Sequence, residues 1–202
     1  MKKNLLFALI ASLAPLGAAA QVLFPPPPPR EITPGPYLGA SLGLAYNRTG
    51  CPDFIRGGGR VCDLRDPSFS GFAGWQLNRF FAGEAQYRYL GKVSSSGFGT
   101  TFSVQTSVLD ATAIGRIPIY GERFFGYGRF GGYRAHLEPS DNTDAPSRVN
   151  YGFTYGLGVQ WELLPQWAAR ADWQRYRHVG NNLLYGSSTY DALTLGVLYR
   201  LR

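Results

Sequence analysis

The amino-acid sequence predicts an all-β fold, an eight-stranded antiparallel up-and-down transmembrane β-barrel. Large apolar residues alternate with small or polar ones over segments of about ten residues, the length of a tilted strand that crosses a bilayer. Long and short connections alternate between these segments, as in outer-membrane barrels. The chain also begins with an export signal, and no later segment is apolar for long enough to form a membrane helix.

Residues 150–161 show the alternation most clearly. Large apolar side chains occupy every second position from Tyr151 to Trp161, and Thr154, Gln160 and glycines lie between them. A period of two places the large side chains on one face of a strand and the small or polar ones on the other. A lipid-facing exterior and a narrow polar interior fit these two faces.

The first four expected strands each present apolar residues at alternate positions. Leu38 and Tyr46 bound this pattern in the first strand, and Leu109 and Ile117 bound it in the fourth. In the third strand, Glu84 alternates with outward aromatic residues and therefore faces inward. These strands are expected at about 37–46, 68–77, 81–90 and 105–117.

The last four expected strands follow the same rule. Pro118 and Gly121 mark the short turn before the fifth strand, and Leu164 and Pro165 mark the turn before the seventh. In the eighth strand, apolar residues alternate from Leu193 onward. These strands are expected at about 124–135, 149–161, 167–177 and 190–201.

The connections orient the barrel in the membrane. Those after the second, fourth and sixth strands are short, and the long ones are expected at 47–67, 91–104, 136–148 and 178–189. Long extracellular loops and short periplasmic turns place both ends of the barrel in the periplasm. An aromatic girdle is expected at the periplasmic level, formed by Trp75, Trp161, Trp167 and Tyr199.

The chain divides into three regions. Lys2 and Lys3 precede an apolar run, and an Ala-x-Ala site predicts cleavage before Gln21. Five consecutive prolines from Pro25 predict a short polyproline II tether. We therefore expect a signal peptide at 1–20, a proline-rich periplasmic lead at 21–36 and an outer-membrane β-barrel domain at 37–202.

The net charge of the chain indicates which classes of partner the protein binds. The formal net charge is +7, and no nucleic-acid-binding motif accompanies it. A signal peptide with alternating strands predicts the outer membrane of a Gram-negative bacterium. There, outer-membrane lipid and anionic lipopolysaccharide are the expected partners, and nucleic acid is not.

The inward face of the predicted barrel carries ionisable residues at membrane depth. Buried charges must pair, because an isolated buried charge is very costly. We expect a salt-bridge network in which Glu84 and Arg170 form one rung. Such a network either fills the lumen or acts as a gate whose rungs exchange partners to admit ions. Its expected members are Glu84, Arg88, Asp110, Arg116, Arg129, Arg170, Asp172 and Arg200.

Four segments resemble the transmembrane domain of the outer-membrane protein A (OmpA) family. They are Gly83 to Gly91, Gly128 to Gly132, Ala169 to Gln174 and Leu193 to Arg200. The resemblance covers about 37–202 and implies an eight-stranded barrel with periplasmic termini. It also implies roles in envelope integrity, in adhesion or reception through the loops, and at most in small gated conductance.

The resemblance transfers only in part to individual residues. The inner glutamate and arginine pair of the family aligns with Glu84 and Arg170, but its alternative lysine aligns with Ile114 and its second glutamate with Gln160. A gate that swaps two salt bridges thus lacks two of its charges, for which Arg116 or Asp110 would have to substitute. The final strand ends Leu201-Arg202 and not in the aromatic residue that the outer-membrane assembly machinery, an expected partner, usually reads. We also expect no peptidoglycan-binding domain after this strand.

The first long loop holds two cysteines and several arginines. Cys51 and Cys62 are expected to form a disulfide in the oxidising periplasm, and no histidine lies near them to complete a metal site. No motif predicts a cofactor. A solvated loop is the simple interpretation, and a surface for lipopolysaccharide phosphates or an acidic host ligand is the sharper one. Its residues would be Arg48, Arg56, Arg60 and Arg65.

An enzyme that modifies lipid A is the third class of function considered. Hydrolysis needs a nucleophile, a base and an orienting acid within hydrogen-bonding reach. His136 and His178 are the histidines near the extracellular strand ends, and the His-x-Ser spacing of lipid A deacylases is absent. The accompanying candidates are Ser140, Ser187, Ser188, Glu138 and Asp191. We therefore expect a non-enzymatic protein that supports the envelope and interacts through its loops, with a narrow gated channel as the alternative.

Overall fold

The computed structural model describes residues 34–48, 61–63, 65–97, 100–121, 123–139, 148–179 and 188–201. Within this part of the chain, no helix is long and apolar enough to cross a membrane. The predicted signal peptide and most of the proline-rich lead lie outside the described residues. The strands are β1 (Gly35–Asn47), β2 (Val61–Asp63), β3 (Arg65–Gln76), β4 (Phe81–Gly97), β5 (Thr100–Tyr120), β6 (Phe124–Pro139), β7 (Arg148–Glu162), β8 (Trp167–Val179) and β9 (Ser188–Arg200).

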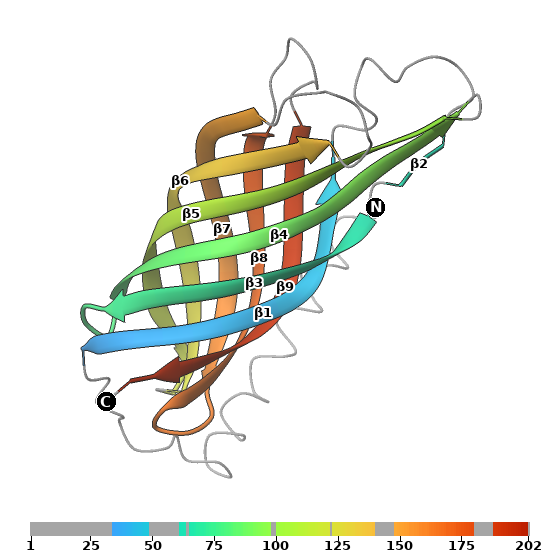
Figure 1. Cartoon of the computed structure of the whole chain (residues 1–202). Coiled ribbons are helices and arrows are strands. Elements are labelled where there is room, and N and C mark those ends of the chain that lie inside the picture. Colours follow the sequence, from blue (N-terminus) through green and yellow to red (C-terminus); the bar gives the residue numbers. More distant parts are fainter. Residues whose placement is uncertain are drawn as a thin grey trace, which may run out of the picture.

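Eight of these strands close into a barrel (Figure 1). Each pairs antiparallel with its neighbours in the order β4-β3-β1-β9-β8-β7-β6-β5, and β4 pairs with β5 to close the ring. The two ends of the barrel meet where the Leu201 N–H donates a 3.0 Å hydrogen bond to the Pro36 carbonyl. The predicted eight-stranded up-and-down barrel is therefore confirmed.

The β4–β5 hairpin corrects one sequence-based expectation. Residues 91–104 were expected to form a loop, but β4 continues to Gly97 and β5 resumes at Thr100. The short strand β2 pairs with Ser94 to Ser96 of this extension, beyond the end of β3 (Figure 1). Outside the bilayer, backbone pairing does not need an apolar face. The alternation on which the prediction depended is therefore missing from this serine- and glycine-rich segment.

A bulge marks the point where the extension begins. The register of β4 against β5 shifts between Tyr89 and Gly91, and Gly91 has a φ of 94°. A side chain is excluded here, because an added Cβ would lie 2.3 Å from the Asp66 Cβ. The Asp66 carboxylate accepts a hydrogen bond from the Lys92 N–H. Glycine is thus required both by the left-handed backbone and by this close approach.

The polarity of the two faces of the barrel wall is inverted relative to a water-soluble protein, with apolar side chains outside and charged ones inside. Leu42 is 70% exposed and Tyr151 is 72% exposed on the outside, whereas Arg88 inside is 0% exposed. At the periplasmic strand ends, Trp161 stacks on Phe124 at 5.3 Å between ring centroids, and Trp167 packs on Tyr199 at 4.9 Å. An apolar exterior with an aromatic girdle is the surface of a protein that spans a membrane.

Two buried apolar clusters divide the interior into levels. At the end of the barrel that is predicted to be extracellular, one cluster, which we call the extracellular apolar layer, consists of Ala45, Leu90, Val108, Tyr133, Ala135, Leu137, Tyr176, Val179, Tyr190 and Ala192. The periplasmic apolar layer consists of Tyr37, Phe72, Ala82, Ile114, Tyr127, Ala168 and Leu198. Charged and polar side chains occupy the space between the two layers and continue past the periplasmic one. The strand register therefore positions a charged site inside a largely apolar frame.

Candidate functional site

The centre of the lumen holds two carboxylates and two arginines from three strands. Glu84 of β4 accepts a 2.6 Å hydrogen bond from Arg170 Nη1, a bond from Arg129 Nη2, and a 3.0 Å bond from the Tyr37 hydroxyl. Arg129 Nη1 lies 3.1 Å from Asp172 Oδ1. Two positive and two negative charges thus neutralise one another where no water-facing surface is available.

Arg170 is held by aromatic rings as well as by its ion pair. Its guanidinium carbon lies 5.0 Å from the Phe72 ring centroid, 5.3 Å from that of Tyr127 and 5.6 Å from that of Tyr37. Its Nε donates a 2.9 Å hydrogen bond to Gln160 Oε1. Cation–π contacts gain strength in such a desolvated place. Arg170 therefore joins the charged centre to the periplasmic apolar layer.

The extracellular side of the charged centre is less completely paired. Asp110 Oδ2 accepts hydrogen bonds from the Tyr176 hydroxyl at 2.7 Å and from Gln174 Nε2 at 3.3 Å, while Arg88 Nη2 reaches Gln174 Oε1 at 3.5 Å. Among the described residues, Arg88 Nε and Nη1 and Asp110 Oδ1 have no hydrogen-bond partner. This level therefore has spare donors and a spare acceptor on adjacent strands.

A second ion-pair group lies at the periplasmic end of the lumen. Glu162 accepts two 2.6 Å hydrogen bonds from Arg200, and Arg116 Nη1 lies 3.8 Å from Glu162 Oε1. Glu162 is not among the predicted lumen residues, because the alternation predicts a strand that ends at residue 161. Extending the inward period from Thr154 through Gln160 by one more step would have included it.

The structure places all eight expected lumen residues on the inward face. Glu84, Arg129, Arg170 and Asp172 form the central group. Arg116 and Arg200 meet at Glu162. Arg88 and Asp110 are linked through Gln174, and no ion pair joins the two within the described part of the chain.

Only part of the predicted arginine loop can be located. Arg56, Arg60 and Cys51 lie outside the described residues, as does the side chain of Cys62, so the predicted disulfide is not described. Arg48 Nε lies 2.8 Å from Asp191 Oδ2, and the Arg65 guanidinium lies 5.1 Å from the Tyr46 ring centroid.

The candidate hydrolytic residues do not form a catalytic group within the described chain. His136 Nε2 lies 3.0 Å from Glu138 Oε1 at the exposed end of β6. His178 has a φ of 62° at a bulge in β8, and both oxygens of Asp191 bind arginines. Ser140 and Ser187 lie outside the described residues, and Ser188 bonds to neither histidine. No group of three potential ligands among the described residues could hold a metal ion.

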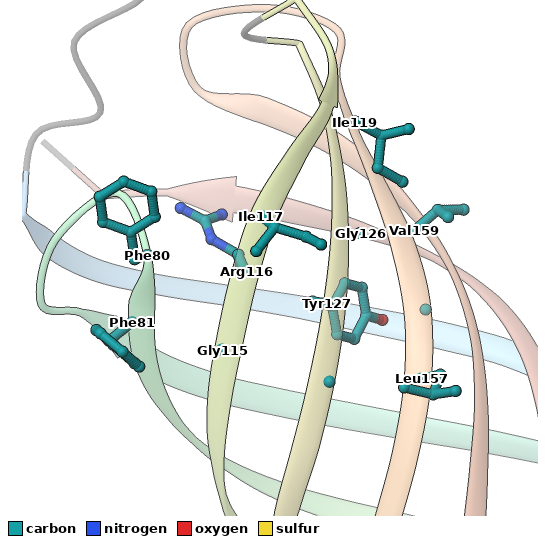
Figure 2. A pocket seen from close by; sticks show the side chains of 12 residues that line it. Phe80, Phe81, Gly115, Arg116, Ile117, Ile119, Gly126, Tyr127, Leu157 and Val159 are labelled. Carbon is teal, nitrogen blue, oxygen red and sulfur yellow. The ribbon is translucent and has the colours of Figure 1, made fainter.

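A hollow of about 670 Å³ lies on the wall of the barrel near its periplasmic end (Figure 2). Gly115 and Gly128 are cross-strand partners on β5 and β6, so the wall is thin at this point. Figure 2 shows Phe80 and Phe81 to one side of the hollow and Leu157 and Val159 to the other. The lining is mostly apolar, with Arg116 and Tyr127 as its polar members, and it offers room for acyl chains.

The whole barrel, with its charged lumen, matches a known family. Residues 35–202 match the OmpA-like transmembrane domain. The chain belongs to this family. The resemblance seen in four sequence segments is therefore confirmed for the OmpA-like barrel.

This OmpA-like barrel is 28% identical over 208 residues to outer membrane protein A of Escherichia fergusonii and to that of Shigella dysenteriae. Each alignment covers 99% of this chain and 56% of the relative, so the chain spans about half the length of these curated relatives. The relatives are outer-membrane proteins of Gram-negative bacteria, and the chain is accordingly an outer-membrane barrel.

Solved structures share the fold of this OmpA-like barrel. Neisserial surface protein A is 13% identical, with a TM-score of 0.62 and coverage of 84% of this chain and 99% of that one. The N-terminal barrel of Pseudomonas aeruginosa OprF is 14% identical, with a TM-score of 0.53 and coverage of 84% and 100%. Ail of Yersinia pestis is 17% identical, with a TM-score of 0.51 and coverage of 83% and 99%. At these identities the likeness concerns the fold alone.

Proposed function

We propose that this OmpA-like barrel is a non-enzymatic protein of the outer membrane, which supports the envelope and interacts with ligands through its extracellular side. The observation that carries this proposal is the buried apolar cluster on the extracellular side of the lumen. Charged side chains are paired at the centre of the lumen, and this apolar layer separates them from the extracellular end. Such an interior serves as a structural plug.

The extracellular apolar layer is the main barrier to ions. Its residues come from six strands and are 0–7% exposed, and Tyr133 packs edge-to-face on Tyr176 at 5.5 Å between ring centroids. A hydrated ion would have to displace these rings or lose its water, and unpaired charges are very costly in such surroundings. Eight strands also leave an interior that side chains can nearly fill.

A planar-bilayer recording of the refolded protein tests the plug. We expect no reproducible conductance steps from the wild type, because the apolar layer excludes hydrated ions. The gel shift of unboiled against boiled protein serves as the control that the barrel has folded. Reproducible steps from folded wild-type protein would contradict the plug.

A gated channel is the second candidate, and the unpartnered atoms of Arg88 and Asp110 favour it. They give the lumen spare groups with which Glu84 or Arg129 could pair if the central rungs exchanged partners. The same recording with Arg170→Ala separates the two functions. Steps in the wild type that change in this variant would establish a gate, whereas silence in both proteins would leave the plug.

The surface interaction that we propose is with anionic ligands. The formal net charge of +7 and the arginines of the first long loop support it. The fold also has a precedent, since Ail was solved in complex with the heparin analogue sucrose octasulfate. Lipopolysaccharide and an acidic host ligand both carry the required charge.

Sucrose octasulfate is a practical probe for the loop arginines. Replacing Arg48, Arg56, Arg60 and Arg65 together with glutamine should weaken its binding by about tenfold or more, because charge-assisted contacts to sulfate are lost. Titration calorimetry of the refolded barrel measures the change. Arg123→Gln, at the opposite, periplasmic end, is the matched control. Unchanged binding in the fourfold variant would exclude the loop surface.

A further inference from the structure

A charged row crosses four strands on the outward face of the barrel, near its extracellular end. Arg65 of β3 is the cross-strand partner of Tyr46 on β1, Tyr46 is the partner of Asp191 on β9, and Asp191 is the partner of Arg175 on β8. We call these four residues the anion row. They lie at one level of the wall, so the barrel itself fixes their spacing.

Asp191 organises the arginines of this row. It accepts hydrogen bonds from Arg175 Nε at 2.6 Å, from Arg175 Nη2 at 2.7 Å and from Arg48 Nε at 2.8 Å. The side chain of Asp191 is 5% exposed, while that of Arg48 is 65% exposed. The carboxylate is therefore covered by the guanidiniums that it orients. Two arginines, Arg48 and Arg175, bind this single carboxylate, so the group carries an excess of positive charge.

Aromatic rings hold two of the guanidiniums against the wall. The Arg65 guanidinium carbon lies 5.1 Å from the Tyr46 ring centroid, and that of Arg175 lies 5.1 Å from the Trp173 ring centroid. A stacked guanidinium loses less conformational entropy when it binds a ligand, and its planar fork matches the oxygens of a phosphate. The row thus resembles a preorganised anion site more than a set of solvated side chains.

The row borders an amphipathic hollow of about 460 Å³. Tyr46, Arg48, Arg65 and Asp191 line its polar side. One step nearer the middle of the membrane lies a second row, which we call the apolar row: Leu44 pairs with Leu193, and Leu193 pairs with Trp173. Leu193 and Trp173 line the hollow as well. Cationic groups therefore lie directly above an apolar surface, near the extracellular ends of the strands.

We propose that the anion row and Arg48 bind a phosphorylated glycolipid of the outer leaflet, namely the lipid A part of lipopolysaccharide. A lipid A phosphate would accept hydrogen bonds from Arg48, Arg65 and Arg175, and an acyl chain would lie over Leu193 and Trp173. A soluble acidic ligand would use the charges but leave the apolar row uncovered, so the pairing of the two rows favours a lipid. The inference rests on the proposed outer-membrane function and adds a binding site on the barrel wall, which shares Arg48 and Arg65 with the loop surface but does not need Arg56 or Arg60.

Native mass spectrometry of the refolded barrel with added lipid A tests the proposal. The wild type should retain bisphosphorylated lipid A. Its affinity for lipid A without phosphates should be lower by about tenfold or more. The double variant Arg65→Gln with Arg175→Gln should lose a similar factor for the phosphorylated form. Arg134→Gln, an exposed arginine of β6 outside the hollow, is the matched control and should bind as the wild type does. The gel shift on boiling checks that each variant has folded.

Several outcomes would overturn the site. Equal retention of the two lipid A forms would show that phosphate is not recognised, and equal loss in Arg134→Gln would show that any surface charge suffices. Displacement by inorganic phosphate at the concentration of the lipid would show that the apolar row contributes nothing. A variant with Arg56→Gln and Arg60→Gln separates this site from the loop: it should keep lipid A even where it loses sucrose octasulfate.

Discussion

At the scale of single residues, Glu84 has the greatest effect on the charge balance of the lumen. It is the carboxylate that Arg129 and Arg170 share. Arg129 has a second carboxylate in Asp172, whereas Arg170 otherwise has Gln160 and aromatic rings. Removing the charge of Glu84 therefore leaves Arg170 as a buried cation without an anionic partner.

This asymmetry predicts a stability effect. Glu84→Gln should lower the free energy of unfolding by ~3–5 kcal/mol, the usual cost of breaking a buried ion pair. Urea titration of the barrel in lipid vesicles measures it. Glu138→Gln, at an exposed strand end, should change stability by less than about 0.5 kcal/mol. The double variant Glu84→Gln with Arg170→Met should recover part of the loss, since it buries no unpaired charge. A double variant less stable than Glu84→Gln would contradict this account.

At the scale of elements, the strands that face lipid were predictable and their extensions were not. Lipid on one face and a packed lumen on the other impose a period of two, which placed β7 at 149–161 against the observed Arg148–Glu162. Beyond the membrane no such constraint acts, so the β4–β5 extension and β2 gave no signal. The same error at a strand end concealed Glu162 and with it the periplasmic ion-pair group.

Pairing between elements was also only partly predictable. The inward parity of Glu84 and Arg170 could be read from their own strands. Two other pairings depend on the register across several strands. Arg129 is the second partner of Glu84 inside the barrel, and Asp191 binds Arg48 and Arg175 on the outside. Register is a property of the closed sheet, and a single sequence does not contain it in readable form.

At the scale of the whole molecule, the barrel is divided along its axis into levels of different chemical character. The central charges are enclosed by an apolar layer at each end, and the outward anion row lies at the extracellular end of the same strands. The interior therefore favours a rigid plug, while the chemistry available to ligands lies on the outer wall and the loops. Function at the surface and closure of the lumen are thus compatible in one small barrel.

The plug makes a prediction about the molecule as a whole. Tyr133→Ala together with Tyr176→Ala should give conductance steps in a planar bilayer where the wild type is silent, because both rings belong to the extracellular apolar layer. The Tyr133 hydroxyl donates to the Arg177 carbonyl at 2.5 Å and the Tyr176 hydroxyl to Asp110 at 2.7 Å, so the change also frees polar groups that attract water. Tyr151→Ala, which removes an outward ring, should stay silent. If the folded double variant is silent too, the barrier lies in the charged centre, and adding Arg170→Ala to it should then produce the steps.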